Sequence, residues 1–442
     1  MAFTNRLKTT ILLTGDLALF YLSLYLALLL RYQSPVSEKI WSAHQIPFFC
    51  IHLLWLFIFY INNLYEIKTF SSLKIIIKRA THALTIMAVL AALIFYLLPG
   101  AGIAPKTILF IDIIILAPLL ILWRKTFWSL AKKGSKTKTL FFGNSKEVEE
   151  TVTHLKENAQ IGYEPTIVLS GVDKNLPDLI KQYGIQLIVA SENIMRSPEG
   201  AKMFYEQALP LGVSIMGFPD FYEIIFGKIP LSMVNEIWFL ENLREINKKS
   251  FEMMKRMFDV TGAALLGLPT LFLIPFAALA IKINSNGPVF YKHERVGKNG
   301  KIFKIIKFRS MIKDAEKNGA VWAATKDKRI TKVGSILRKT RIDELPQLWN
   351  ILKGELSFVG PRPERPEFVK TLEEKIPHYS IRHLVKPGAS GWAQINYPYG
   401  ASVEDAIKKL QYDLYYIKNR SVTLDLSIFL KTTMVMLRSA GR

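Results

Sequence analysis

The feature that most constrains this chain is a set of long apolar runs within its first 125 residues. A helix needs about 20 apolar residues to cross the ~30 Å hydrocarbon core of a bilayer. Runs of about this length predict membrane helices, in which every backbone group is paired within its own segment. We therefore expect residues 1–125 to form a four-helix transmembrane domain. The four runs span roughly residues 11–30, 46–62, 82–98 and 107–123.

The basic residues around these runs predict their orientation. Lysine and arginine gather before the first run, between the second and third, and after the fourth, whereas the two opposite loops hold few. Cytoplasmic loops carry the excess of such residues. We expect the N-terminus and everything after residue 124 to be cytoplasmic. Asp16 and Asp112 lie within the first and fourth runs, where ionisable groups usually face the bundle interior; packing is the preferred interpretation, and neither receives a function.

Composition narrows the class of partner. The formal charge of +22 suits nucleic acid, an anionic membrane surface or phosphorylated substrates. Because the basic clusters adjoin apolar runs, we expect lipids and phosphorylated substrates, and no nucleic acid. The single cysteine, Cys50, excludes an intramolecular disulfide and a cysteine-based zinc site.

Residues 138–218 alternate between strand-like and helix-like segments, which predicts a small parallel α/β domain. A dinucleotide-binding fold would need Gly-x-Gly-x-x-Gly after its first strand, but only Gly143 is present there. We expect a structural or regulatory role rather than NAD binding. The candidate strands are Lys138–Phe142, Thr166–Ser170, Gln186–Ala190 and Val213–Gly217.

A mixed connector, residues 219–249, leads to a fifth apolar run at Val260–Ala280. Hydropathy alone would make this run a further span. Both of its flanks are basic, however, and Pro269 and Pro275 interrupt it, each removing a helix hydrogen bond. We expect a broken, re-entrant membrane helix at about 257–283 that returns to the cytoplasmic face. A crossing helix is the alternative, because true spans also tolerate proline.

Two adjacent carboxylates, Asp343 and Glu344, follow a strongly basic stretch. Residues 301–344 contain thirteen Lys or Arg and five Asp or Glu, a net charge of +8. Such a field lowers carboxylate pKa values and attracts polyanions. An aspartate that is ionised at neutral pH can attack phosphorus without a general base. The alternative is that the pair only favours the first turn of a helix.

Further motifs surround this pair. Residues 287–300, with Arg295, read as a hairpin because Asn-Gly favours a tight turn. Arg309 follows in Lys-Phe-Arg-Ser-Met, and Arg338 lies in Gly-x-x-x-Arg-Lys. These arginines suit phosphate oxygens, although a solvated charged hairpin and contacts with lipid headgroups are alternatives. Arg362 lies on a stiff turn between two prolines, Pro361 and Pro363.

The stretch Asp-Glu-Leu-Pro-Gln-Leu-Trp-Asn-Ile-Leu-Lys-Gly-Glu-Leu-Ser-Phe-Val-Gly-Pro-Arg-Pro, residues 343–363, resembles the signature of bacterial polyprenyl-phosphate sugar-1-phosphate transferases, the monotopic phosphoglycosyl transferases. Lys-Arg-Met-Phe-Asp at 255–259 resembles the start of that family's re-entrant helix. The hairpin motifs, and Lys-Pro-Gly-Ala-Ser-Gly-Trp-Ala-Gln ending at Gln394, also match. The resemblance runs from about Lys255 to the C-terminus and more weakly over the whole chain. The family's usual Ser-Pro break is absent, which leaves the angle and depth of the re-entrant helix open.

The resemblance implies a mainly helical catalytic domain at residues 250–442, beside a degenerate Rossmann-like domain and the transmembrane helices. It implies transfer of a sugar 1-phosphate from a UDP-sugar to undecaprenyl phosphate at the bacterial inner membrane, to initiate an exopolysaccharide, capsule or O-antigen. Asp343 would attack the donor's β-phosphorus, release UMP and carry the phosphosugar. Glu344 would hold Mg²⁺. The residues expected to bind substrate are Arg295, Arg309, Arg338, Pro361, Arg362, Pro363 and Gln394.

Two alternatives stay open. A membrane glycosyltransferase would release UDP, and a scaffold of polysaccharide assembly would release no nucleotide. No residue selects the sugar, and a homodimer through the membrane or α/β domains would be consistent with this organisation.

Overall fold

The computed structural model describes residues 2–67, 72–97, 105–134, 136–171, 175–243, 249–312, 315, 327, 329–398, 400 and 402–437. The chain divides into two compact units, Met1–Phe221 and Tyr222–Arg442. The boundaries expected at residues 125, 138, 218 and 250 are finer than this division and stay predictions.

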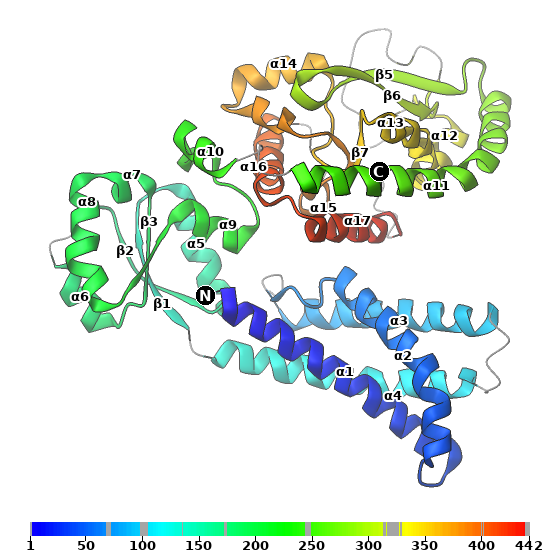
Figure 1. Cartoon of the computed structure of the whole chain (residues 1–442), viewed down its shortest axis with the longest axis horizontal. Helices are drawn as coiled ribbons and strands as arrows, with labels where there is room; N and C mark the ends of the chain where they lie inside the picture. Colours follow the sequence, from blue (N-terminus) through cyan, green and yellow to red (C-terminus); the bar gives the residue numbers. More distant parts are fainter. Residues whose placement is uncertain are drawn as a thin grey trace. The chain divides into compact units, whose positions relative to one another are not determined.

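The first unit begins with four helices that pack around one apolar core (Figure 1). Large side chains from different helices meet in this core, among them Phe20, Trp55 and Leu120, all fully buried. The four-helix architecture expected from the apolar runs is confirmed. The helices are α1 (Ala2–Tyr32), α2 (Glu38–Ile61), α3 (Leu73–Leu97) and α4 (Pro105–Lys133).

Three of these helices, α1, α2 and α4, are long and apolar enough to cross a membrane. Helix α3 contains the third predicted run but does not meet the same measure within the described residues. Its first turns carry Lys74, Lys78 and Arg79, and residue 98, the end of the predicted run, lies outside the described part. A fourth candidate, α11 (Lys249–Asn284), belongs to the second unit.

One group of polar side chains inside the bundle is paired. Asp16 of α1 accepts hydrogen bonds from Arg124 of α4 at 2.5 Å and from Tyr65 at 2.8 Å. Asp16, Arg124 and Asp112 are almost wholly inaccessible to solvent. Both aspartates therefore face the bundle interior, as expected for ionisable groups in apolar runs.

A four-stranded parallel sheet follows in the first unit, with the strand order β2-β1-β3-β4. Alternate residues of β1 face opposite sides, so Leu140 and Phe142 pack with helices α6 and α8 while Phe141 packs against Phe221 of α9. The expected small parallel α/β domain is confirmed. The strands are β1 (Thr137–Phe142), β2 (Tyr163–Leu169), β3 (Leu187–Ala190) and β4 (Ser214–Gly217). The helices are α5 (Lys146–Glu157), α6 (Leu176–Tyr183), α7 (Glu192–Arg196), α8 (Pro198–Met203) and α9 (Phe218–Phe226).

The second unit is mainly helical, as expected. Its core joins side chains from widely separated segments, including Trp238, Ile351, Val359 and Leu414. Its helices are α10 (Glu236–Asn242), α11, α12 (Lys332–Lys339), α13 (Leu348–Lys353), α14 (Pro366–Lys375), α15 (Trp392–Asn396), α16 (Val403–Asn419) and α17 (Val422–Leu437). The longer 3₁₀ helices among them are η8 (Ile342–Gln347) and η9 (Tyr379–Leu384).

Two small sheets complete the second unit. Strands β5 (Phe290–Val296) and β6 (Ile302–Phe308) form an antiparallel hairpin. Asn299 and Gly300 at its turn both have positive φ, 56° and 75°, which is the conformation that Asn-Gly favours. The predicted hairpin is therefore confirmed. Strands β7 (Ser357–Val359) and β8 (Gly388–Ser390) pair in parallel.

Helix α11 is continuous through Pro269 and Pro275, whereas the sequence suggested a break. Figure 1 shows the ribbon of α11 changing direction in its second half. Proline removes a helix hydrogen bond and is a common cause of such bends. Many of its apolar side chains are exposed to the surroundings: Leu265, Leu268, Leu271, Phe272, Phe276, Leu279 and Ile283.

Candidate active site

The two adjacent carboxylates occupy the first turn of η8, between helices α12 and α13. Arg341, directly before η8, has a left-handed backbone with φ 58°, which non-glycine residues rarely adopt. This tight turn separates the basic helix α12 from η8. The suggestion that the carboxylates lie at a helix start is thus correct, but it does not explain their surroundings.

Asp343 is buried, with 7% of its surface exposed. Its Oδ1 atom is buried and has no hydrogen-bond partner among the described residues. Burial and the neighbouring charge of Glu344 raise the pKa of Asp343 to about 6. The sequence predicted a lowered pKa from the basic field, and this was wrong. The charges of Lys307, Arg338 and Arg341 act in the predicted direction but do not offset the loss of hydration.

Glu344 is surrounded by cations instead. Its Oε1 atom accepts a hydrogen bond from Lys307 Nζ at 2.8 Å and lies 3.5 Å from Arg362 Nη2. Its Oε2 atom lies 3.8 Å from Arg341 Nη1. Burial alone would raise the pKa of Glu344, but Lys307 and Arg362 outweigh it and hold the pKa below its usual range. The predicted direction of the shift is right for this residue.

Arg362 reaches this group from the turn after β7. Its side chain is 37% exposed, and its Nη2 atom lies 3.5 Å from Glu344 Oε1. Arg338 lies on α12 and donates from Nε to Ser310 Oγ at 2.8 Å. Its charge also acts on Asp343. The structure therefore gathers two of the expected substrate-binding arginines around the two carboxylates.

A small pocket lies beside these groups. It unites Arg295 and Pro363, expected from the sequence, with Lys307, which contacts Glu344. The residues that line it are Arg295, Ile305, Lys307, Gln347, Arg362, Pro363, Gly388 and Ala389.

Other predicted residues lie elsewhere in the second unit. Arg309 is buried and donates to the backbone oxygens of Ser285 (2.6 Å) and Asn286 (3.1 Å), directly after α11, so it fastens the end of that helix. Gln394 donates weakly to Ala389 O at 3.4 Å, and Ala389 lines the pocket. Pro361 is buried within the turn. Substrate binding by these residues stays a prediction.

Sequence reasoning missed Lys307 and Arg341 as site residues. Lys307 lies in the same motif as Arg309, but the motif alone does not show which cation faces Glu344. The position becomes clear only from the pairing of β5 with β6, which fixes the direction of each side chain.

Asn350, which is fully buried, links two elements of the site through its side-chain amide. Its amide donates to Lys304 O at 2.8 Å and to Glu355 Oε2 at 2.7 Å, while its oxygen accepts from Ile306 N at 3.1 Å. Residue 350 thereby fixes α13, which follows the carboxylates, against β6, which carries Lys307.

Comparisons with known proteins cover this same region. Residues 250–439 match the family described as bacterial sugar transferase. The UDP-N-acetylgalactosamine-undecaprenyl-phosphate N-acetylgalactosaminephosphotransferase of Aeromonas hydrophila is 45% identical over 192 residues, 43% of this chain and 45% of that protein. The undecaprenyl-phosphate glucose phosphotransferase of Komagataeibacter xylinus is 42% identical over 184 residues, 40% of this chain and 35% of that protein. The chain thus spans less than half the length of these two relatives.

A shorter relative is covered almost completely. The uncharacterized sugar transferase EpsL of Bacillus subtilis is 41% identical over 188 residues, which make up 42% of this chain and 89% of that protein. The family match over residues 250–439 contains both carboxylates, Lys307 and the Arg362 turn.

We predict that Asn350→Ala lowers stability by about 2 kcal/mol, because a buried N–H and a buried carbonyl each lose their partner. Thermal unfolding of the purified protein in detergent checks this. Asn396→Ala is the control, since the side chain of exposed Asn396 bonds, among the described residues, only to the Trp392 carbonyl of its own helix. Equal midpoints for the two variants would contradict the role given to Asn350.

Proposed function

Because this chain belongs to the bacterial sugar transferase family, we propose that it transfers a sugar 1-phosphate from a UDP-sugar to undecaprenyl phosphate. The observation that carries the proposal is the contrast between the adjacent carboxylates. Asp343 is buried with an oxygen that accepts no hydrogen bond among the described residues, whereas Glu344 is paired with cations. Asp343 suits attack on phosphorus, and Glu344 suits the binding of cations.

In the first step, Asp343 Oδ1 attacks the β-phosphorus of the donor. The new Asp–phosphorus bond forms as the bond from the β-phosphorus to the bridging oxygen breaks, and UMP leaves with that electron pair. In the second step, an oxygen of undecaprenyl phosphate attacks the same phosphorus and releases the aspartate. The product is a polyprenyl diphosphate sugar, and the two steps predict ping-pong kinetics.

The chain's cations support both steps. Arg362, whose side chain is 37% exposed, would donate two parallel hydrogen bonds to phosphate oxygens. Lys307 neutralises Glu344, and Lys307 and Arg362 both line the pocket beside it. Negative charge that develops on the phosphates would thus be stabilised by Lys307 and Arg362, which are already in position.

The residues also fit Mg²⁺. Among the described residues no cluster of three acidic, histidine or cysteine side chains could hold a metal alone. Mg²⁺ is commonly held by one or two carboxylates together with waters and substrate phosphates. Glu344 Oε2, with Arg341 Nη1 3.8 Å away, offers such an oxygen. Once bound, the ion would neutralise phosphate charge.

We also propose that α11 is re-entrant. At 36 residues it would be about 54 Å long if straight, longer than the ~30 Å hydrocarbon core. Yet its first turns bond to the segment 351–359, and its last residues bond to Arg309 and to Val333 N. Both ends thus contact one compact unit, which a straight crossing helix could not do. Its exposed apolar side chains would lie in lipid.

A re-entrant α11 would hold the second unit at the membrane surface. The carboxylates would then lie at the level of the phosphate group of a membrane lipid. The cytoplasmic side of the inner membrane suits a UDP-sugar donor. Two further points stay predictions: that the sheet domain is a degenerate Rossmann-like domain, and that the protein forms a homodimer.

We predict UMP release from one UDP-sugar when purified protein receives undecaprenyl phosphate and Mg²⁺. Asp343→Asn should lower the rate at least ~10³-fold, because the nucleophile is lost. Asp178→Asn, at an exposed position on helix α6 of the first unit, is the control. Release of UDP would instead indicate a glycosyltransferase, and no release across a broad donor panel would favour a scaffold.

The re-entrant proposal predicts same-side labelling in a Cys50→Ser background. Single cysteines at Ser250, in the first turn of α11, and at Lys292, beyond its end, should react with an impermeant maleimide in inverted vesicles and not in spheroplasts. A cysteine at Ser34, between α1 and α2, should show the opposite pattern. Reaction of Ser250→Cys and Lys292→Cys from opposite sides would show that α11 crosses the membrane.

A further inference from the structure

The turn at residues 359–364, which carries Arg362, is held through its backbone carbonyls. Three of the donors are side-chain cations from separate elements, α11, η9 and β5, and two are backbone N–H groups. The bonds are Lys255 Nζ to Val359 O (2.8 Å), Gly388 N to Pro361 O (2.9 Å), Arg382 Nη2 to Arg362 O (2.9 Å), Arg295 Nη1 to Pro363 O (2.9 Å) and Val296 N to Glu364 O (3.0 Å).

Each of the three cations has a carboxylate partner of its own. A cation buried without such a partner would lose its hydration with nothing to offset the loss, and each pair supplies that offset. A charged donor also makes a stronger hydrogen bond to a carbonyl than a neutral one. The pairs are Lys255 with Asp425 (2.5 Å), Arg382 with Asp413 (2.8 Å) and Arg295 with Glu364 (3.6 Å).

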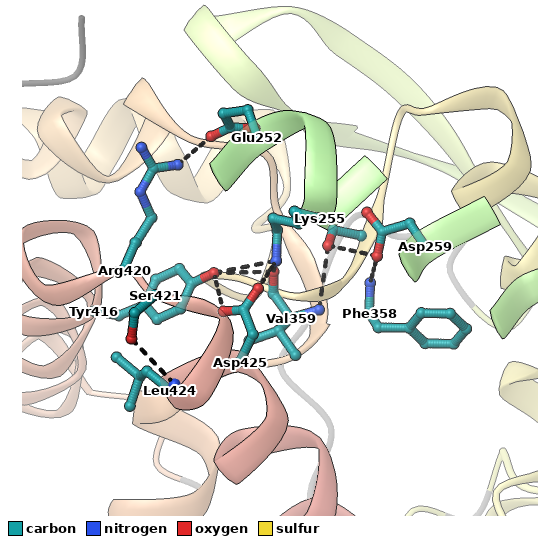
Figure 2. A network of polar contacts seen from close by, with 11 residues as sticks. Glu252, Lys255, Asp259, Phe358, Val359, Tyr416, Arg420, Ser421, Leu424 and Asp425 are labelled. Atoms are coloured by element: carbon teal, nitrogen blue, oxygen red, sulfur yellow. Dashed lines mark hydrogen bonds and ion pairs between the residues drawn. The ribbon is translucent and has the colours of Figure 1, made fainter. Parts of the chain in front are cut away.

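The first turns of α11 hold the strand before the turn as well. Asp259, four residues after Lys255 and so on the same helix face, accepts hydrogen bonds from Ser357 Oγ and Phe358 N, both at 3.0 Å (Figure 2). Figure 2 shows these side chains converging on β7 from α11. Tyr416 OH also lies 2.9 Å from Asp425 Oδ1 and 3.3 Å from Val359 O.

Arg256, which lies between Lys255 and Asp259 on α11, holds the N-terminal end of the segment 351–359. It donates to Ile351 O and Leu352 O, both at 2.6 Å, at the C-terminal end of α13. A cation at this end of a helix satisfies carbonyls that lack a helical partner. The polar residues at the start of α11 therefore bind both ends of residues 351–359, the chain that links the carboxylates of η8 to Arg362.

We infer that Lys255 with Asp425, together with Arg382–Asp413 and Arg295–Glu364, are positioning residues that set the Arg362 guanidinium against Glu344. This inference rests on the proposed function. Pro361 and Pro363 restrict the backbone on both sides of Arg362. A shift at Val359 is therefore passed on to the guanidinium instead of being absorbed by rotation in the turn.

Arg295 is reassigned by this inference. The sequence suggested that it binds substrate phosphates, but Nη1 donates to the turn itself. Its loss should then lower kcat through Arg362 and leave KM for the donor nearly unchanged.

The test is a double-mutant cycle on UMP release. Lys255→Met/Asp425→Asn removes the donor to Val359 O without leaving an unpaired charge. We expect kcat to fall about 10-fold to 100-fold, the cost of a small misplacement of a catalytic group. In an Arg362→Ala background, assayed at high enzyme concentration, the same pair should change kcat less than about twofold, because both changes act through one contact.

A matched control exists in the same network. Arg420 pairs with Glu252 in the first turns of α11 but bonds to no carbonyl of the turn. Arg420→Met/Glu252→Gln should therefore leave kcat within about threefold, since it removes a similar pair without moving Arg362. Equal losses of kcat in the two pair variants would overturn the inference.

A second pair variant tests the inference if the Lys255→Met/Asp425→Asn protein does not fold. Arg295→Met/Glu364→Gln removes a less buried pair, and its effect should likewise vanish in the Arg362→Ala background. The inference would be overturned if a pair variant lowered kcat by the same factor in the Arg362→Ala background as in the unmodified protein, or if its main effect were a raised KM. Neither outcome would contradict the proposed reaction. Absence of UMP release by the unmodified protein would instead overturn the proposed function, and the inference with it.

Discussion

Two carboxylates can lie side by side in a partly buried turn only if nearby cations offset their repulsion. Here the offset is unequal, because Lys307, Arg362 and Arg341 all contact Glu344, whereas Asp343 accepts no hydrogen bond at Oδ1 among the described residues. The pKa of Glu344 is lowered and that of Asp343 is raised to about 6. Two residues adjacent in sequence thereby acquire different chemistry, one suited to attack on phosphorus and the other to holding charge.

A second group of polar contacts links the site to helix α11. Polar residues at the start of α11 bond to residues 351–359, and Arg309 fastens the other end of the helix to the same unit. The apolar face between these ends is exposed. In the account proposed here, the depth of α11 in lipid and the position of Arg362 are therefore set by one group of buried contacts, which would bring a lipid phosphate and a nucleotide sugar to the same aspartate.

Much of this fold could be predicted from local sequence signals. The apolar runs predicted the N-terminal bundle, the strand–helix alternation predicted the parallel sheet, and Asn299-Gly300 predicted the hairpin turn. The family resemblance supplied Asp343, Glu344 and Arg362 by motif. What sequence could not supply was the environment of each group. A net charge of +8 suggested a lowered pKa for both carboxylates, but burial decides the direction for Asp343.

Pairings across long sequence distances were equally hidden. Lys255 and Asp425 are 170 residues apart, and nothing in either segment names the other. Arg309 belongs to a motif that suggested phosphate binding, yet its guanidinium lies against the end of α11. Helix α11 also continues through both prolines, because a bend can absorb the missing hydrogen bonds without a break.

The most direct measurement is intact-protein mass spectrometry of the enzyme incubated with its UDP-sugar and Mg²⁺ in the absence of undecaprenyl phosphate, followed by peptide mapping. The account predicts one UMP released per active site and a phosphosugar on the peptide that contains Asp343. Subsequent addition of undecaprenyl phosphate should remove this adduct. Unmodified protein and no UMP until the lipid is added, with full turnover afterwards, would show direct transfer and contradict the covalent role of Asp343.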